Sequence, residues 1–251
     1  MTLVDNAAFD RPRADVLPYA AAARWIHYPV LFGQGPWVRA RALAMPEPGG
    51  LREGEMGEGA PLRLLITGDS SAAGVGVRTQ DEALLGQLST RLARRYRVSY
   101  QLVARTGNTT GMTARMLAAF PPQQADVVLT GLGVNDITGG IPIRTWLKQT
   151  RALLDQIQQQ TGAKLIIVSG LPPVHQFPLL PNPLRWVLGA EARRRDAALR
   201  EMLTDHPFAK WMTLHLDLGP HNMSEDGFHP GPEVYREWAR VADGILRAHD
   251  I

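Results

Sequence analysis

From residue 62 to the end of the chain, short apolar runs alternate with longer segments in which apolar residues recur at the spacing of a helix. The short runs contain β-branched residues and have the length of buried strands. We expect strands over 62–67, 97–103, 126–130, 164–169 and 211–216. We expect helices over 81–96, 110–120, 142–161, 184–204 and 232–249. Five apolar strands separated by helices predict an α/β fold, with a five-stranded parallel sheet covered by helices on both faces.

The first 60 residues lack this alternation of strands and helices. Residues 46–60 are rich in Gly, Glu and Pro and have no apolar period, which predicts a flexible linker. We therefore divide the chain into an N-terminal arm and linker over 1–60 and a folded domain over 61–251.

Residues 16–37 carry several aromatic side chains, but charged residues, prolines and glycines interrupt them too often for a membrane-spanning helix. A short helix and extended arm packed on the domain is the expectation, and an interfacial membrane anchor over 16–37 is the alternative. Residues 1–13 contain Asp5 and Asp10 and lack the positive start of a secretory signal peptide. We expect a cytoplasmic protein, with membrane association as the alternative.

Composition is ordinary for a soluble globular protein. The 251 residues suffice for one domain with a full core, and 45% of them are apolar and 20% charged. The net charge is only +3, and the basic residues come in short groups on predicted helices, so we expect no nucleic-acid partner. The chain has no Cys, which excludes disulfides, thiolate metal sites and a Cys nucleophile. The oligomeric state is left open.

Four polar stretches lie at or near the ends of the predicted elements. Residues 68–70, 105–108 and 133–136 follow the first three strands, and residues 226–229 precede the last helix. Right-handed crossovers bring the carboxyl ends of parallel strands to one edge of the sheet, which is where ligands bind in such folds. We therefore expect the four stretches to converge.

Together these stretches contain the groups that ester hydrolysis needs. Ser70 supplies a hydroxyl nucleophile, His229 a base, and Asp226 a carboxylate that can orient the imidazole. The backbone N–H groups of Ser70 and Gly107 and the side-chain amide of Asn135 can form an oxyanion hole. Each residue also has an ordinary structural role as a cap or turn residue. The combination favours catalysis over those separate roles.

At this point the chain resembles the SGNH or GDSL hydrolases. The resemblance rests on GDSS at 68–71, Gly107 within RTGNTT, GVND at 133–136 and DGFH at 226–229, in that order, and covers residue 62 to the C-terminus. Ser71 stands where many members have another residue. The resemblance implies a flavodoxin-like three-layer α/β/α fold and metal-free serine catalysis. It also implies esterase, lipase, thioesterase or carbohydrate-deacetylase activity, without selecting among them.

The leading hypothesis is a serine esterase that hydrolyses a small-molecule acyl ester through an acyl-enzyme intermediate. Alternatives within the same fold are a carbohydrate O-deacetylase, a lysophospholipase or a thioesterase. An alternative of another class is a catalytically silent binding or membrane-associated module. We expect no cofactor, because Gly131 and Gly133 follow a strand as in a dinucleotide fingerprint but position 136 is Asp and not Gly. We expect no metal, because the spacing of the C-terminal histidines matches no ligand motif. These histidines are His206, His215, His221 and His229.

The loop over residues 171–183 is unusually apolar and contains five prolines, which restrict its backbone. Exposed apolar side chains on such a loop are typical of a binding surface. Phe177, Leu179 and Leu180 are therefore candidates for the wall of an acyl pocket. Covering the edge of the sheet is an equally good interpretation of the same side chains.

Overall fold

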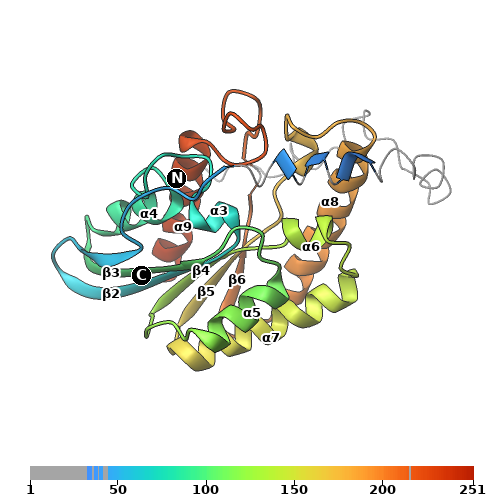
Figure 1. Ribbon diagram of the computed structural model, residues 1–251. Coiled ribbons are helices and arrows are strands. Elements are labelled where there is room, and N and C mark those ends of the chain that lie inside the picture. Colours follow the sequence, from blue (N-terminus) through green and yellow to red (C-terminus); the bar gives the residue numbers. More distant parts are fainter. Residues whose placement is uncertain (1–32, 36, 39, 42–44, 215) are drawn as a thin grey trace, which may run out of the picture.

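The computed structural model describes residues 33–35, 37–38, 40–41, 45–214 and 216–251 (Figure 1). The expectations for residues 1–13, for most of the segment 16–37 and for His215 therefore lie outside the described residues. Among the residues described, no helix combines the length and apolar character needed to cross a membrane.

The core of the molecule is one sheet of six strands in the order β1-β3-β2-β4-β5-β6. The strands are β1 (Glu53–Met56), β2 (Ala60–Gly68), β3 (Tyr96–Ala104), β4 (Val127–Gly131), β5 (Leu165–Ser169) and β6 (Ala209–Met212). Strands β2 to β6 are parallel, and every residue of β4 and β5 is buried. This is the burial that continuous apolar runs predict for strands covered on both faces.

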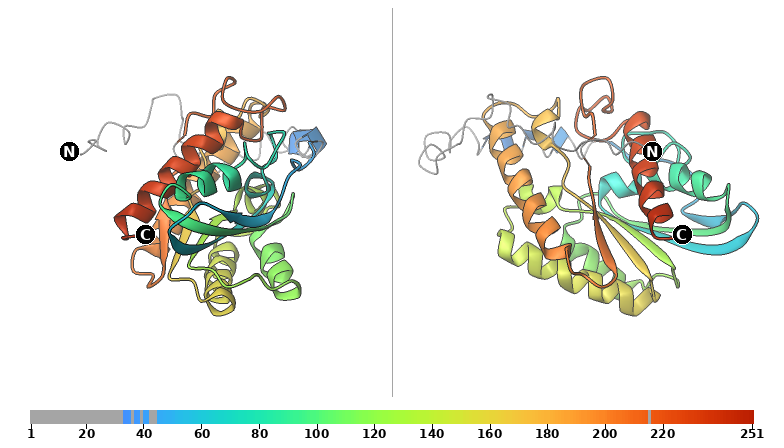
Figure 2. Two further views of the ribbon diagram at one scale, coloured as in Figure 1. Left: turned by 90° about the vertical axis from the view of Figure 1, so that its left-hand side faces the viewer. Right: turned by 180° about the vertical axis from the view of Figure 1, so that it is seen from behind.

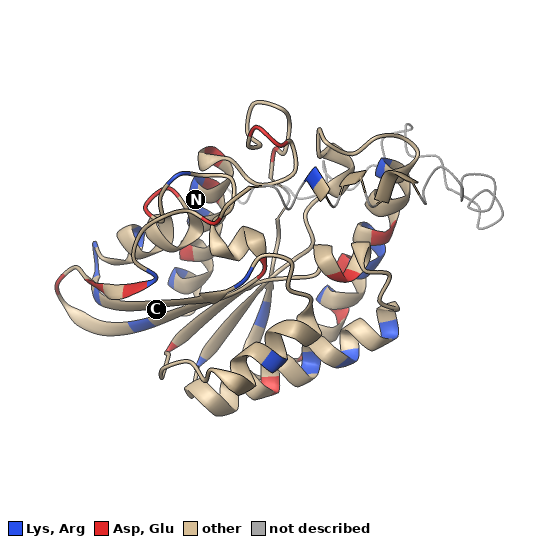
Figure 3. Ribbon diagram, in the orientation of Figure 1, with Lys and Arg blue, Asp and Glu red and all other residues tan. Residues whose placement is uncertain are grey.

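Helices lie on both faces of the sheet and give the expected three-layer α/β/α arrangement (Figures 1 and 2). Helices α4 and α9 pack together on one face, and α5 and α7 pack together on the other. The helices are α3 (Ser70–Ala73), α4 (Leu84–Leu92), α5 (Thr110–Ala119), α6 (Val134–Thr138), α7 (Ile143–Thr161), α8 (Leu184–Leu203) and α9 (Pro232–Ala248). Positive and negative side chains are interspersed along α7 and α8 (Figure 3).

Two differences from the predicted elements concern the edges of the sheet. Strand β1 lies within the stretch expected to be a flexible linker, and it pairs antiparallel with β3 from Glu53 opposite Gln101 to Met56 opposite Val98. Its residues are exposed or half-buried, so an apolar period does not mark it. At the other edge, β6 begins at Ala209 and ends at Met212, so only the first two residues of the strand expected over 211–216 belong to it.

The described part of the N-terminal arm contacts the loops at the carboxyl edge of the sheet. The side-chain amide of Gln34 donates to the carbonyl of Asn182 at 2.9 Å and accepts from the backbone N–H of Leu184 at 3.3 Å. Val38 is buried, and the sulfur of Met45 lies 3.6 Å from Ser224 Oγ. These contacts join the arm to the end of the loop 171–183 and to the loop before α9.

At the carboxyl end of β2, the chain turns where two strands approach closely. Gly68 has a φ of +155°, and a Cβ at this position would overlap the carbonyl oxygen of Gly131 on β4. The next residue, Asp69, donates its backbone N–H to that same carbonyl at 3.1 Å. A glycine at position 68 therefore allows the chain to leave the sheet directly beside β4.

We expect Gly68→Ala to reduce the free energy of unfolding by about 2–3 kcal/mol, since the added methyl must displace a strand backbone. Gly244→Ala is a matched control, because Gly244 is an exposed residue of α9 and a Cβ there meets nothing within 4 Å. This control should stabilise the protein by up to about 1 kcal/mol. Urea unfolding measures both values, and equal effects of the two variants would contradict the close approach at Gly68.

Candidate active site

Ser70 is the first residue of α3, directly after the turn that ends β2. Asp69 caps this short helix, and its Oδ1 accepts the backbone N–H of Ser71 at 2.9 Å. The helix stops after one turn, where Gly74 takes a left-handed conformation and Val75 N–H bonds to the Ser70 carbonyl at 2.9 Å. Ser70 is thus held in a tight strand-turn-helix at the carboxyl edge of the sheet.

The side chains of Ser70, His229 and Asp226 form a continuous hydrogen-bonded line. His229 Nε2 lies 3.0 Å from Ser70 Oγ, and His229 Nδ1 lies 2.6 Å from Asp226 Oδ2. Ser70 and His229 are 159 residues apart in the chain, and both are buried. The fold therefore brings the three predicted residues together in the order that a nucleophile, a base and an orienting carboxylate require.

Four hydrogen bonds fix the carboxylate of Asp226. Besides the His229 ring on Oδ2, Oδ1 accepts from Ser224 Oγ at 2.6 Å and from the backbone N–H groups of Phe228 and His229 at 2.9 Å each. Burial raises the pKa of Asp226, but the hydrogen bonds from His229 and Ser224 outweigh it and hold the pKa well below its usual range. The carboxylate beside the imidazole is therefore ionised.

Ser224 is a residue that the sequence analysis did not single out. Its hydroxyl supports Asp226, and its backbone N–H bonds to the His229 carbonyl at 2.9 Å, so it closes the loop around the pair. A hydroxyl residue two positions before an Asp is the only sequence signal for it, and such pairs occur in many ordinary turns.

The predicted oxyanion donors come from the loops after β2, β3 and β4. Asn135 lies on α6, and its Nδ2 donates to the backbone carbonyl of Asn108 at 3.0 Å, which leaves its second amide hydrogen available. Gly107 has a φ of +81° in the loop after β3. In the part of the chain that the structure describes, the backbone N–H groups of Ser70 and Gly107 donate no hydrogen bond to protein.

Asp136 joins the loop after β3 to the loop after β4. Its fully buried carboxylate accepts the backbone N–H of Thr110 at 3.1–3.2 Å and the Thr110 hydroxyl at 3.0 Å. Burial raises the pKa of Asp136, and the bonds from Thr110 oppose that shift. Strand β2 lies between β3 and β4, so the turn that bears Ser70 lies between these two loops. The link from Asp136 to Thr110 therefore fixes the position of Asn135 relative to the loop that contains Gly107.

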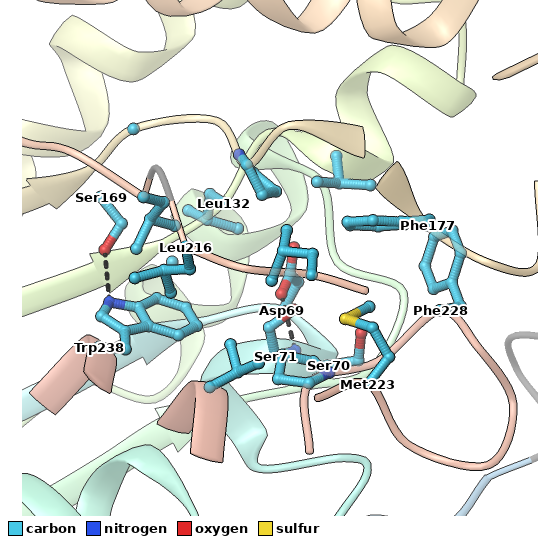
Figure 4. Close-up of a pocket in the computed structure, with 18 of the residues that line it drawn as sticks. Asp69, Ser70, Ser71, Leu132, Ser169, Phe177, Leu216, Met223, Phe228 and Trp238 are labelled. Carbon is cyan, nitrogen blue, oxygen red and sulfur yellow. Dashed lines mark hydrogen bonds between the residues drawn. The ribbon is translucent and has the colours of Figure 1, made fainter. Parts of the chain in front are cut away.

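A pocket opens beside Ser70, with a volume of about 640 Å³ that includes some space open to solvent (Figure 4). Of the three expected wall residues in the loop 171–183, the structure places Phe177 on the pocket. Leu179 and Leu180 do not line it, and Leu180 is packed in the core at 1% exposure. Leu179 is partly buried against the same core. Six other lining residues come from the chain between β6 and α9.

Among the described residues, no three His, Asp or Glu side chains gather in an arrangement that could hold a metal ion. The side chains of His229, Asp226 and Asn135 are instead hydrogen-bonded to Ser70, to one another or to backbone. The arrangement can accept a proton from a hydroxyl, hold the resulting imidazolium beside a carboxylate, and offer N–H donors to an oxyanion.

A sequence profile of the GDSL-like lipase/acylhydrolase family matches residues 66–237. No curated protein matches the chain. The following similar solved structures are between 17% and 20% identical to the chain, so the likeness shows a shared fold.

The lipase Lip_vut3 from a goat rumen metagenome is 19% identical with a TM-score of 0.57, covering 73% of this chain and 96% of that chain. A family 3 carbohydrate esterase from Clostridium thermocellum is 17% identical with a TM-score of 0.57, covering 75% of this chain and 98% of that chain. The esterase EstA from Pseudoalteromonas sp., in a structure inhibited by monoethylphosphonate, is 20% identical with a TM-score of 0.53, covering 74% and 98%.

Burial raises the pKa of Asp69 to about 6, although the Ser71 N–H opposes the shift. In the unfolded chain an Asp has a pKa of about 3.9. Between pH 4 and 6 the unfolded state loses this proton while the native state keeps it, so stability falls as pH rises through that window. At 1.36 kcal/mol per pKa unit, the free energy of unfolding falls by about 3 kcal/mol across this window.

Asp69→Asn keeps an acceptor for Ser71 but has no proton to lose. We therefore expect its free energy of unfolding to rise by about 3 kcal/mol relative to that of the wild type when the pH is raised from 4 to 7. Urea unfolding at both pH values measures the difference. Asp81→Asn removes an exposed carboxylate and should show no such gain. A constant difference between Asp69→Asn and the wild type at both pH values would contradict the burial of a proton at Asp69.

Proposed function

The chain belongs to the GDSL-like lipase/acylhydrolase family, and from this premise we propose that it is a serine esterase that cleaves acyl esters through a Ser70–His229–Asp226 triad. The observation that carries the proposal is the hydrogen-bonded line through these side chains, at 3.0 Å and 2.6 Å. A structural serine has no use for a buried imidazole on one side and an ionised carboxylate behind it. A nucleophile needs both.

In the first half-reaction, Ser70 Oγ attacks the carbonyl carbon of the ester while its proton passes to His229 Nε2. The C=O π electrons move to the carbonyl oxygen and form a tetrahedral oxyanion. When this species collapses, the bond from carbon to the alcohol oxygen breaks and the alcohol leaves with the proton from His229. The carboxylate of Asp226, at 2.6 Å from Nδ1, stabilises the imidazolium that exists between these two proton transfers.

The oxyanion is stabilised by donors fixed before the substrate arrives. We assign this role to the backbone N–H groups of Ser70 and Gly107 and to the second amide hydrogen of Asn135. The bond from Asn135 to the Asn108 carbonyl at 3.0 Å supports this role, because it orients the amide at no further cost during the reaction.

In the second half-reaction, a water molecule attacks the acyl-enzyme and gives its proton to His229 Nε2. The second tetrahedral species expels Ser70 Oγ, which takes the proton back, and the carboxylic acid product leaves. The same three groups and the same donors therefore serve both halves of the cycle.

An acyl ester with an apolar acyl group is the substrate class that the pocket favours, since most of its lining side chains are aliphatic or aromatic. A carbohydrate O-deacetylase, a lysophospholipase or a thioesterase would use the same chemistry on other substrates, and similar structures include a lipase and a carbohydrate esterase. A panel of p-nitrophenyl esters, acetylated sugars, lysophospholipids and acyl thioesters separates these activities.

Ser70→Ala should lower ester hydrolysis by about 10⁴- to 10⁶-fold and abolish labelling by a p-nitrophenyl alkylphosphonate, because the attacking oxygen is gone. Mass spectrometry of the intact protein detects the adduct. Ser89→Ala is the matched control, since Ser89 is buried in α4 with no hydrogen-bond partner for its hydroxyl among the described residues. Absence of an adduct on the folded wild type would favour a catalytically silent module.

Asn135→Ala should lower kcat by about 10²- to 10³-fold with a smaller change in KM, because the lost donor acts on charge that develops in the transition state. Steady-state kinetics on one activated ester separates the two constants. A rise in KM at constant kcat would assign Asn135 to substrate binding instead.

A further inference from the structure

We propose that the pocket beside Ser70 is a closed-ended site for a straight aliphatic acyl chain, and that Trp238 and Ser169 form the end that limits chain length. The inference rests on the proposed esterase function, because it assigns the acyl half of the substrate to one particular space. It extends that function by naming the residues that set specificity.

The aliphatic wall of this site comes from three parts of the chain: the residues after β4, the segment that connects β6 to α9, and the start of α9. In the view of Figure 4, Leu132 and Leu216 lie between the two ends of the pocket. The aliphatic wall consists of Leu132, Val134, Leu214, Leu216, Leu218 and Val234. Burying methylene groups against such a wall is favourable and requires no specific polar partner.

The polar content of the lining argues for an alkyl chain and against a sugar or a charged head group. Of the described residues that line the pocket, only Asp69 can carry a charge, and its carboxylate already accepts the Ser71 N–H. Asn135 donates one amide hydrogen to Asn108, and Ser169 accepts from Trp238. The other polar side chains of the lining are the hydroxyls of Ser70 and Ser71, so most polar atoms of a hydroxyl-rich acyl group would lack partners there.

Trp238 closes the far end and is fixed from several sides. Its indole Nε1 donates to Ser169 Oγ at 3.1 Å, and both residues are buried. The ring stacks on Tyr235 with centroids 6.3 Å apart, and the hydroxyl of Tyr235 donates to the Val75 carbonyl at 2.7 Å. A Cβ at Gly131 would lie only 3.0 Å from the indole, so the ring rests against the backbone of β4.

At the opposite end, aromatic rings stand beside the catalytic histidine. Phe177 and Phe228 meet edge to face at 5.2 Å, and Phe228 meets the His229 ring at 5.3 Å. In Figure 4 these two phenylalanines lie at the other end of the pocket from Trp238 and Ser169, and Ser70 lies between the ends. An acyl chain bonded to Ser70 and directed toward Trp238 therefore leaves the aromatic end for the departing alcohol.

The test is the dependence of kcat/KM on chain length for saturated p-nitrophenyl esters from acetyl to palmitoyl. We expect kcat/KM to rise by about fourfold for each added methylene until the chain reaches Trp238, and then to fall. Trp238→Leu should shift the maximum to longer chains by at least two methylenes. Leu216→Trp should shift it to shorter chains, with at least a tenfold change in the ratio of long-chain to short-chain kcat/KM.

Trp186→Leu and Leu51→Trp are matched controls for the two substitutions, since both residues are exposed and neither lines the pocket. Their chain-length profiles should coincide with that of the wild type. If Trp238→Leu does not fold, the Leu216→Trp profile still decides the question. Unchanged maxima in folded pocket variants would overturn the proposal.

Binding of decanoate to Ser70→Ala, measured by calorimetry, separates this inference from the esterase function. We expect saturable binding that weakens at least tenfold in the double variant with Leu216→Trp. Binding by a protein that hydrolyses no ester would overturn the esterase function and support the pocket. Hydrolysis of acetyl esters without a chain-length maximum and without decanoate binding would overturn the pocket and leave the esterase function standing.

Discussion

At the carboxyl ends of β2 and β4, Gly68 and Gly131 lie against each other, and the backbone of Asp69 bonds to the Gly131 carbonyl. No side chain separates the two strands there, so Ser70 emerges directly beside the loop that carries Asn135. The same lack of a side chain at Gly131 lets the Trp238 ring rest on β4. The position of Ser70 and the depth of the pocket thus depend on one close backbone contact.

Around that contact, the polar groups are fixed by bonds between loops of different strands. Asp136 ties the segment after β4 to Thr110 after β3, and Asp226 is held by four donors in the loop before α9. Burying carboxylates costs stability unless hydrogen bonds compensate. The two cases differ: the bonds to Asp226 outweigh its burial, whereas the pKa of Asp136 stays raised. Such preorganisation is what transition-state stabilisation requires.

The three-layer α/β/α fold was predictable because β4 and β5 are uninterrupted apolar runs and the helices between the strands have a clear apolar period. Convergence of Ser70, Asp226 and His229 followed from the parallel sheet and the order of the motifs. The polar strand β1 was not predictable, since an exposed edge strand has no apolar period. Leu180 and Trp238 show the same limit inside the protein: an apolar side chain in a loop or helix does not reveal whether it faces the core or a cavity.

Strand β1 also has a consequence for the behaviour of the protein in concentrated solution. It occupies the outer side of β3, whose free N–H and C=O groups would otherwise offer a template for another chain. Its own exposed sequence contains Glu53 and Glu55, and Glu55 accepts a bond from Ser99 at 3.1 Å. A short acidic border of this kind resists edge-to-edge pairing, so the segment before β2 protects the sheet against aggregation.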